Sequence, residues 1–165
     1  MSAACVGNLF ASIDHKSCCC LNEDDAAPLA NVLTVEPTDA VLRSDCDEQL
    51  LITVAFTSKV KLHSIVMASG AANAPSHVKI FVNMPSLSFD DAEDAEPVQE
   101  LDLDAKAVAA GDAIPLEFVR FQNVRSLTLF IDANAADDDV TELSHLGFIG
   151  SSTDGMDMSE LKAVG

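Results

Sequence analysis

The cysteines are the residues of this chain best suited to chemistry. Cys18, Cys19 and Cys20 are consecutive, His15 precedes them, and Cys46 follows. Thiolates and imidazoles bind tetrahedral zinc, but structural zinc sites usually place paired cysteines two to four residues apart. Adjacent side chains point apart, whereas Cys18 and Cys20 would point to the same side of an extended segment. We therefore interpret these residues as small thiols without a metal, and keep a metal site or a redox-sensitive set of Cys18, Cys20 and Cys46 as alternatives.

The cysteine pattern also bears on the compartment. The chain has five cysteines, no C-x-x-C motif and no N-x-S/T glycosylation site. An odd number of cysteines, three of them consecutive, is a poor disulfide framework, so the pattern favours a reducing compartment. We expect a cytoplasmic protein that is also found in the nucleus, without a thioredoxin-type dithiol.

Catalytic motifs are missing. The sequence contains no GxSxG, GxxxxGK[ST], GxGxxG or HExxH pattern, and its seven glycines offer little for a phosphate-binding loop. The four histidines, His15, His63, His77 and His145, are scattered along the chain. The sequence does not single out a carboxylate that would pair with any of them for acid–base catalysis. We expect that the protein is not an enzyme, with no catalytic residue, no cofactor and no bound metal.

An acidic run is the other candidate for ligand binding. Its residues are Asp90, Asp91, Glu93, Asp94 and Glu96. Calcium takes six to eight oxygen ligands, usually from acids at alternate positions around a sharp turn at glycine. This run has no glycine and is interrupted by alanines. We therefore predict a solvated or partner-facing acidic loop.

Composition limits the range of functions further. The 165 residues include 9 Lys and Arg against 27 Asp and Glu, which gives a formal charge of -18. Such a charge repels phosphate backbones and anionic lipid surfaces, so we expect no nucleic acid and no membrane partner. No apolar run approaches the roughly 18 residues of a membrane span. With 48% hydrophobic residues, the chain can bury one core, and we expect a monomer.

Short apolar runs predict the fold. Residues 50–56, 60–67, 78–83, 115–121, 126–131 and 143–150 are rich in Val, Ile, Leu and Phe and are bounded by polar or turn residues. They predict an all-β protein, an antiparallel β-sandwich with Leu50 or Ile52 and Leu127 or Leu129 in its core.

Other segments are expected to be less regular. Residues 1–43 should hold little regular structure, and residues 105–110 suffice only for a helical turn. We place a flexible start at residues 1–7, the domain at 8–150 and a short tail at 151–165. The few basic residues Arg120 and Arg125 should pair with nearby carboxylates, and His63 and His77 should point outward or be hydrogen-bonded.

Three long stretches resemble a known family. They are SDCDEQLLITVAFTSKVKLHSI from Ser44, HVKIFVNMPSLSFDDAEDAEPVQELDL from His77, and PLEFVRFQNVRSLTLFI from Pro115. They are similar to the PITH domain, the carboxy-terminal module of proteasome-interacting thioredoxin-like proteins. The resemblance implies a jelly roll of the galactose-binding type and association with the regulatory particle of the 26S proteasome, in the cytosol and nucleus.

The same resemblance places Cys18, Cys20 and Cys46 where the thioredoxin-like members have similar cysteines. Two departures from the family are visible. The thioredoxin domain that usually precedes the module is not in this sequence, and the family's Thr-Thr-Arg-Ile stretch reads Val-Thr-Glu-Leu from Val140 to Leu143. Glu142 thus replaces a basic residue, and we expect altered binding if that position contacts a partner.

The leading hypothesis is a non-catalytic module that docks on the proteasome regulatory particle through loops. The predicted contact residues are Asp45, Asp47, Glu48, Gln49, Asp90, Asp91, Gln122, Asn123 and Arg125. One alternative is a jelly roll that binds a small ligand, although the absence of Trp and Tyr counts against sugar binding. The other is a sensor based on the cysteines.

Overall fold

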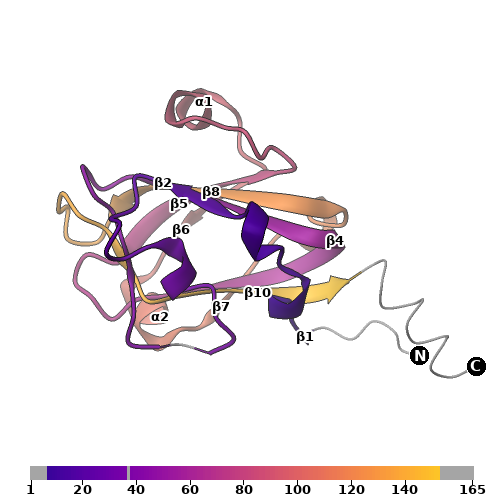
Figure 1. Ribbon diagram of the computed structural model, residues 1–165, viewed down its shortest axis with the longest axis horizontal. Helices are drawn as coiled ribbons and strands as arrows, with labels where there is room; N and C mark the ends of the chain where they lie inside the picture. The colour runs from indigo at the N-terminus through magenta and orange to yellow at the C-terminus, as the bar shows by residue number, and fades with distance from the viewer. Residues whose placement is uncertain (1–6, 37, 153–165) are drawn as a thin grey trace, which may run out of the picture.

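The computed structural model describes residues 7–36 and 38–152. Most of the predicted flexible start and tail therefore lie outside the described residues. Gly7 already belongs to strand β1 (Gly7–Asn8), and Ser152 ends strand β10 (His145–Ser152). These two strands pair with each other, so the two ends of the described chain lie side by side (Figure 1).

Strand β4 (Leu50–Ala68) organises the fold because it belongs to two layers. Its first part pairs with β2 (Cys19–Leu21) and with β8 (Val124–Asn134). Its second part pairs with β10 and with β7 (Ala113–Pro115). The predicted pair of strands at 50–56 and 60–67 is thus one strand of 19 residues. The intervening Thr-Ser-Lys contains no Gly or Pro to turn the chain, and a shift of register replaces the turn.

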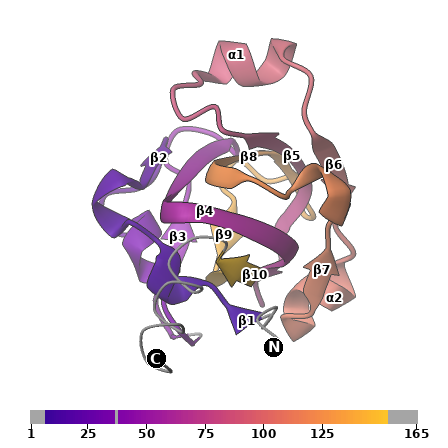
Figure 2. The ribbon, with the colours of Figure 1, turned by 90° about the vertical axis from the view of Figure 1, so that its right-hand side faces the viewer.

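Two antiparallel layers result. The first has the order β2-β4-β8-β5-β6, with β5 (Pro75–Val82) and β6 (Gln99–Asp102) at its far side, and the second has the order β1-β10-β4-β7. A two-stranded sheet of β3 (Leu42–Arg43) and β9 (Glu142–Leu143) closes one end. Figure 2 shows the long β4 crossing the middle of the fold. The predicted β-sandwich of the jelly-roll type is confirmed.

A second register shift explains one glycine. The β10–β4 pairing shifts between Ile149 and Gly150. A Cβ atom added to Gly150 would lie 1.9 Å from the carbonyl oxygen of Lys61, so no other residue fits while the strands stay paired at this spacing.

The main core lies between the two layers. Ile52, Leu127 and Leu129 have no exposed surface, as predicted for this register. Leu51, on the opposite side of β4, is also buried, because it belongs to a second small cluster with Phe81, Phe130 and Ala92. This cluster lies under helix α1 (Phe89–Asp94), which covers part of the outer face of the first layer (Figure 1).

Helix α1 corrects the prediction of an acidic loop. Ser88 accepts a hydrogen bond from the backbone of Asp91, and the Asp91 carboxylate accepts one from the backbone of Ser88. This reciprocal capping satisfies two backbone donors at the start of the helix. Asp90 and Asp91 remain exposed on its first turn, where acids are also favoured by the helix dipole.

Two further segments differ in detail. The predicted strand at 115–121 is only the end of β7 followed by a 3-10 turn, η4 (Phe118–Arg120). Phe121 is buried and Phe118 stacks on His63 at 4.2 Å between ring centroids, so these apolar residues are covered without strand pairing. The possible turn at 105–110 is helix α2 (Ala105–Ala110), which ends at Gly111 with a φ of 73°.

The amino-terminal part has little regular structure, as expected. Besides β1, β2 and β3 it contains three short 3-10 turns, η1 (Phe10–Ser12), η2 (His15–Ser17) and η3 (Leu29–Asn31). Among the residues that the structure describes, no helix is long and apolar enough to cross a membrane.

Candidate functional site

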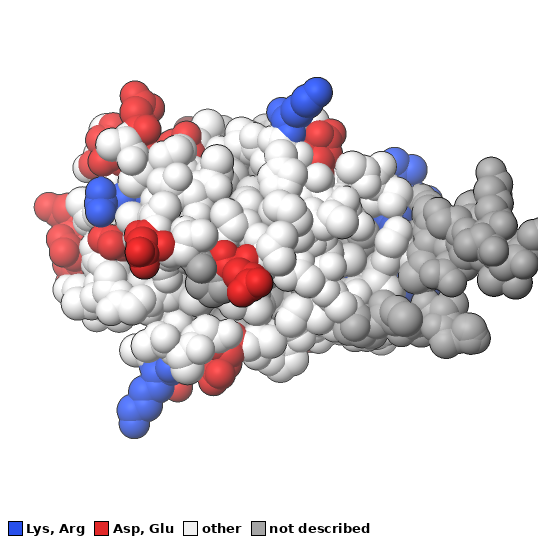
Figure 3. Space-filling model, turned by 60° about the horizontal axis from the view of Figure 1, so that its bottom comes forward, with Lys and Arg blue, Asp and Glu red and all other residues white. Residues whose placement is uncertain are grey.

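Four connecting segments meet at the end of the sandwich where β4 begins and β8 ends. We name residues 22–25, 43–49, 69–74 and 134–142 the acidic loop end, because ten of them are Asp or Glu: Glu23, Asp24, Asp25, Asp45, Asp47, Glu48, Asp137, Asp138, Asp139 and Glu142. Arg43 is the one basic residue in these ranges. On the face shown in Figure 3, acidic side chains gather towards the end opposite the uncertain termini.

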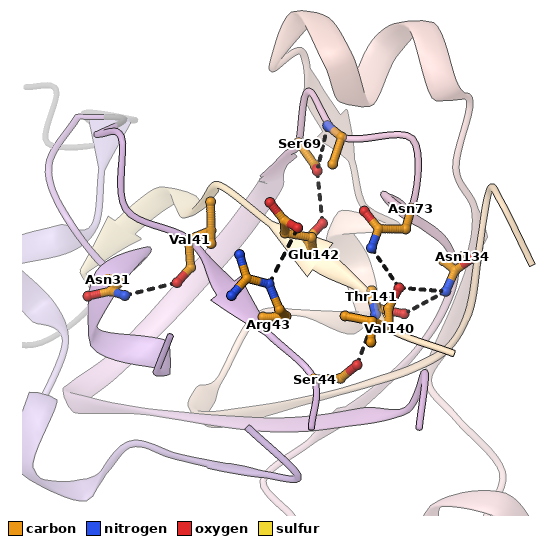
Figure 4. Close-up of polar contacts among 11 residues, drawn as sticks. Asn31, Val41, Arg43, Ser44, Ser69, Asn73, Asn134, Val140, Thr141 and Glu142 are labelled. Atoms are coloured by element: carbon orange, nitrogen blue, oxygen red, sulfur yellow. Dashed lines mark hydrogen bonds and ion pairs between the residues drawn. The ribbon is translucent and has the colours of Figure 1, made fainter. Parts of the chain in front are cut away.

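Thr141 connects two segments of the acidic loop end by hydrogen bonds. Its side chain has no exposed surface, its backbone N–H donates to the Ser44 hydroxyl at 2.9 Å, and its hydroxyl donates to the Glu48 carbonyl at 2.7 Å. The Asn134 amide donates to the Thr141 hydroxyl at 3.0 Å (Figure 4). Because buried polar groups are costly when unpaired, this network fixes the loops in one arrangement.

The loop at 69–74 joins the same network. Ser69 donates its hydroxyl hydrogen to the Glu142 carbonyl, and the Asn73 amide donates to the Val140 carbonyl, both at 2.8 Å (Figure 4). Segments about 70 residues apart in the sequence are therefore held side by side.

The predicted residues at 45–49 lie on this fixed backbone. Asn22, in the left-handed region with a φ of 71°, donates its side-chain amide to the Asp47 carboxylate at 2.9 Å and to the Gln49 carbonyl at 2.7 Å. Asp45 and Asp47 are exposed, whereas Glu48 and Gln49 are half-buried. The exposed carboxylates can thus meet a partner without ordering the loop first.

Glu142 faces Arg43 across the β3–β9 pair. Its carboxylate lies 3.5 Å from the guanidinium (Figure 4). Opposite charges directly across a strand pair favour pairing. Glu142 therefore stabilises the acidic loop end and is partly neutralised by Arg43.

The other predicted contact residues lie elsewhere. Val60 pairs with Val124 near one end of β8, and Leu50 pairs with Ile131 near the other end. At about 3.3 Å per residue, the 11 residues of β8 span roughly 35 Å. Gln122, Asn123 and Arg125 therefore lie at the end opposite Asp45 and Asp47.

At the opposite end, one asparagine side chain holds the backbone of the predicted contact residues. Asn83, with a φ of 59°, donates its amide to the Asn123 carbonyl and accepts the N–H of Arg125. The predicted ion pairing holds for Arg120, whose guanidinium lies 3.1 Å from Glu117, but no carboxylate partner of Arg125 is found among the described residues. Asp90 and Asp91 form a third location, on α1. The structure thus separates the three predicted contact sets.

The cysteines follow the strand geometry expected of them. Cys18 and Cys20 both pack against the core, whereas Cys19 is exposed on the other side. Burial raises the pKa of both the Cys18 and the Cys20 thiol, and the charge of Glu23 adds to the shift at Cys20. Raised thiol pKa values lower the thiolate fraction and hence the reactivity.

Neither alternative for the cysteines gains support from the geometry. The four described cysteines are free thiols, and Cys46 is exposed beside Asp45. Within residues 7–36 and 38–152 no group of three or more His, Cys, Asp or Glu side chains is arranged to hold a metal ion.

A cleft beside β2 was not predicted from the sequence. It has a volume of about 320 Å³ and is lined by His15, Cys18, Cys19, Cys20, Glu23, Pro28, Leu29, Ala30 and Leu33. The sequence offered little signal for it, because the two walls, β2 and η3, meet only in the folded chain. Thr141 and Asn134 were also missed, although a polar residue next to an apolar strand is a recognisable signal for a buried hydrogen bond.

Comparison with known proteins identifies the family. The family model of the PITH domain matches residues 2–165. This chain belongs to the PITH domain family. It is 34% identical over 162 residues to Thioredoxin-like protein 1 of Schizosaccharomyces pombe, covering 95% of this chain and 56% of that protein. It is 32% identical over 151 residues to PITH domain-containing protein 1 of Homo sapiens, covering 88% of this chain and 70% of that protein.

Solved structures agree on the fold. The first two CBM32 domains of Clostridium perfringens ZmpB, in complex with GalNAc, match 87% of this PITH chain and 35% of that chain with a TM-score of 0.63 at 10% identity. A SusE-like protein, BT2857, matches with a TM-score of 0.65, also at 10% identity, over 91% of this chain and 68% of that one. At such low identity these likenesses show the jelly-roll fold and nothing more.

Proposed function

We propose that this PITH domain is a non-catalytic module that docks on the regulatory particle of the 26S proteasome, with the acidic loop end as its principal contact surface. The partner follows from the family resemblance, and the contact surface from the geometry. The observation that carries the proposal is a set of exposed carboxylates, Asp45 and Asp47 foremost, on loops held by the buried Thr141 network. A rigid scaffold that presents polar loops is a common design for protein recognition.

The charge of the surface sets how binding should behave. Carboxylates on a molecule of formal charge -18 attract a basic partner surface over a distance. The Debye length falls from about 10 Å at 0.1 M salt to about 3 Å at 1 M, so association should slow as salt rises.

The test is recovery of the regulatory particle from cell extract by the full chain, read by native mass spectrometry. Replacing Asp45 and Asp47 together with alanine should lower recovery several-fold, since both residues are exposed. The double variant Gln122→Ala with Arg125→Ala is the matched control at the opposite end, and Asp90→Lys with Asp91→Lys controls for acidic charge on α1. Melting curves first establish that each variant is folded.

Two outcomes would count against the proposal. If the parent chain does not recover the regulatory particle, the docking function is wrong, and the small-ligand alternative takes its place. If the parent does so but the Asp45 and Asp47 variant binds equally well at low salt, docking uses another surface.

A further inference from the structure

The first layer has an open edge at β2. This strand pairs with β4 through Cys19 with Thr53, Cys20 with Ile52, and Leu21 with Leu51. Among the described residues no strand pairs with its other side, and Figure 2 shows β2 at the outer left of the fold. In an antiparallel sheet, alternate residues of an edge strand direct N–H and C=O groups away from the neighbouring strand. The backbone of β2 is therefore available to a further strand.

This edge is a short strand of three residues that carries neither a charged side chain nor a proline. Edge strands are normally blocked by charged side chains, proline or a covering segment, because exposed backbone groups invite pairing with another chain. The residues of β2 are Cys, Cys and Leu, and the Leu21 side chain is 42% exposed. An uncharged and partly apolar edge favours the addition of an extended peptide.

The cleft lies beside β2, where it could receive a side chain of the added peptide. Cys18 and Cys20 contribute to one wall, and Leu29 and Leu33 on η3 and the turn after it contribute to another. Side chains alternate along a strand, and residues opposite each other on paired strands share a face. A residue paired with Cys20 would therefore direct its side chain to the same side as the Cys20 thiol, into the cleft.

The charge in the cleft wall selects a second residue of the peptide, on the same side as the apolar one. One oxygen of the Glu23 carboxylate accepts the Leu29 N–H at 2.8 Å, which fixes the carboxylate in the cleft wall. Residues 22–25 follow β2 directly and belong to the acidic loop end. Because side chains alternate, a basic side chain two positions from the apolar one would point to the same side of the peptide and meet Glu23.

We propose that the open edge of β2 and its cleft bind an extended segment of a partner protein. The segment adds to β2 as a strand, inserts one apolar side chain between Cys20 and Leu33, and places Lys or Arg near Glu23. This inference rests on the proposed function only for the statement that the partner is the proteasome regulatory particle.

A displayed library of random twelve-residue peptides tests the site without assuming that partner. The full chain is the target, and enriched peptides should combine alternating apolar residues with Lys or Arg. Ala30 is exposed and lines the cleft, so Ala30→Arg should fill it without touching the core and weaken binding of the enriched peptides at least about tenfold. Ala109→Arg, an equal change on α2, is the control, because α2 and β2 lie on opposite sides in Figure 2.

Hydrogen exchange supplies a second readout. An enriched peptide should slow exchange of those β2 amides that point away from β4, which binding by side chains alone would not do. The inference is overturned if no such peptide is enriched, if Ala30→Arg binds as well as the parent, or if the β2 amides stay unprotected. Recovery of the regulatory particle by Ala30→Arg at the parental level would overturn this docking mode while leaving the proposed function intact.

Discussion

The first layer ends in two edge strands of opposite character. At one edge, β2 carries uncharged side chains beside a cleft. At the other, β6 carries Glu100 and Asp102, whose side chains are 52% and 98% exposed. Charges of this kind discourage pairing with a further strand. The charges on β6 thus disfavour a further strand at that edge, whereas the residues of β2 place no charge at theirs.

The β6 edge is also held by side-chain contacts of the neighbouring strand β5. His77 on β5 lies 2.7 Å from the Asp132 carboxylate on β8 and 3.0 Å from the Glu100 carboxylate on β6. Burial lowers the pKa of His77, but the hydrogen bonds and charges of Asp132, Glu100 and Asp102 outweigh it, so that the pKa is raised overall. When protonated, the imidazole therefore links three strands through opposite charges, and β2 has no equivalent among its contacts.

The largest loss of stability is expected from a substitution in β4, inside the first layer. Ile52 pairs with Cys20 on one side and Leu129 on the other, and it is fully buried. Ile52→Ala should lower the free energy of unfolding by about 2 to 5 kcal/mol. Cys20→Ala, one strand outward, should cost less than about 1 kcal/mol, because its side chain is smaller and half-buried. Urea unfolding measures both, and equal losses would show that the β2 edge is as tightly built as the centre.

Thiol reactivity should separate the two sides of β2. Cys19 is exposed, whereas burial raises the pKa of Cys18 and Cys20. Under native conditions at pH 8, iodoacetamide should alkylate Cys19 and exposed Cys46 at least about ten times faster than Cys20. Peptide mass spectrometry of quenched samples gives the rates. Rapid alkylation of Cys20 in the folded protein would mean that the edge opens readily, and would revive the redox-sensor hypothesis.

The pH dependence of stability should report on the β6 edge. Because the pKa of His77 is raised in the folded state, its stabilising contribution is complete below the unfolded value of about 6.5 and is lost as pH rises through the folded value. The parent should exceed His77→Gln in unfolding free energy by about 1 kcal/mol at pH 6, and the difference should fall as pH rises through the folded pKa of His77.

His145 also makes stability depend on pH, since burial lowers its pKa in the folded state. It is present in both proteins of the His77 comparison, so its effect cancels in the difference between them. A constant difference from pH 6 to pH 9 would contradict the role of His77.

The smallest effect is expected at the ion pair that borders β6. Arg120 donates to the Val98 carbonyl and lies 3.1 Å from Glu117, and both charged side chains are more than half exposed. Exposed pairs contribute little, so Glu117→Gln should change the unfolding free energy by less than about 0.5 kcal/mol. A larger loss in urea unfolding would show that η4 helps to hold the β6 edge.

Most inner strands of the sandwich could be predicted from the amino-acid sequence. Apolar runs with alternating burial located the inner strands, and the same rule placed Cys18 and Cys20 on one side of an extended segment. The spacing of Ser88 and Asp91 is that of a capping box, a local signal for a helix start. The prediction of an acidic loop did not use this signal. These features are local, because side-chain direction and capping depend on residues a few positions apart.

The way in which the strands and loops pair could not be predicted from the sequence, because it depends on contacts between distant residues. Residues 50–56 and 60–67 form one strand because β8 and β10 pair with its two parts. The lack of Gly and Pro between them permits a continuous strand, but the local sequence does not specify these partners. Asp45 and Arg125 lie at opposite ends of the sandwich. Glu142 pairs with Arg43, although the two are nearly one hundred residues apart in the sequence. Register and long-range pairing minimise buried, unpaired polar groups over the whole chain. The acidic loop end and the open edge at β2 could therefore be recognised only after folding.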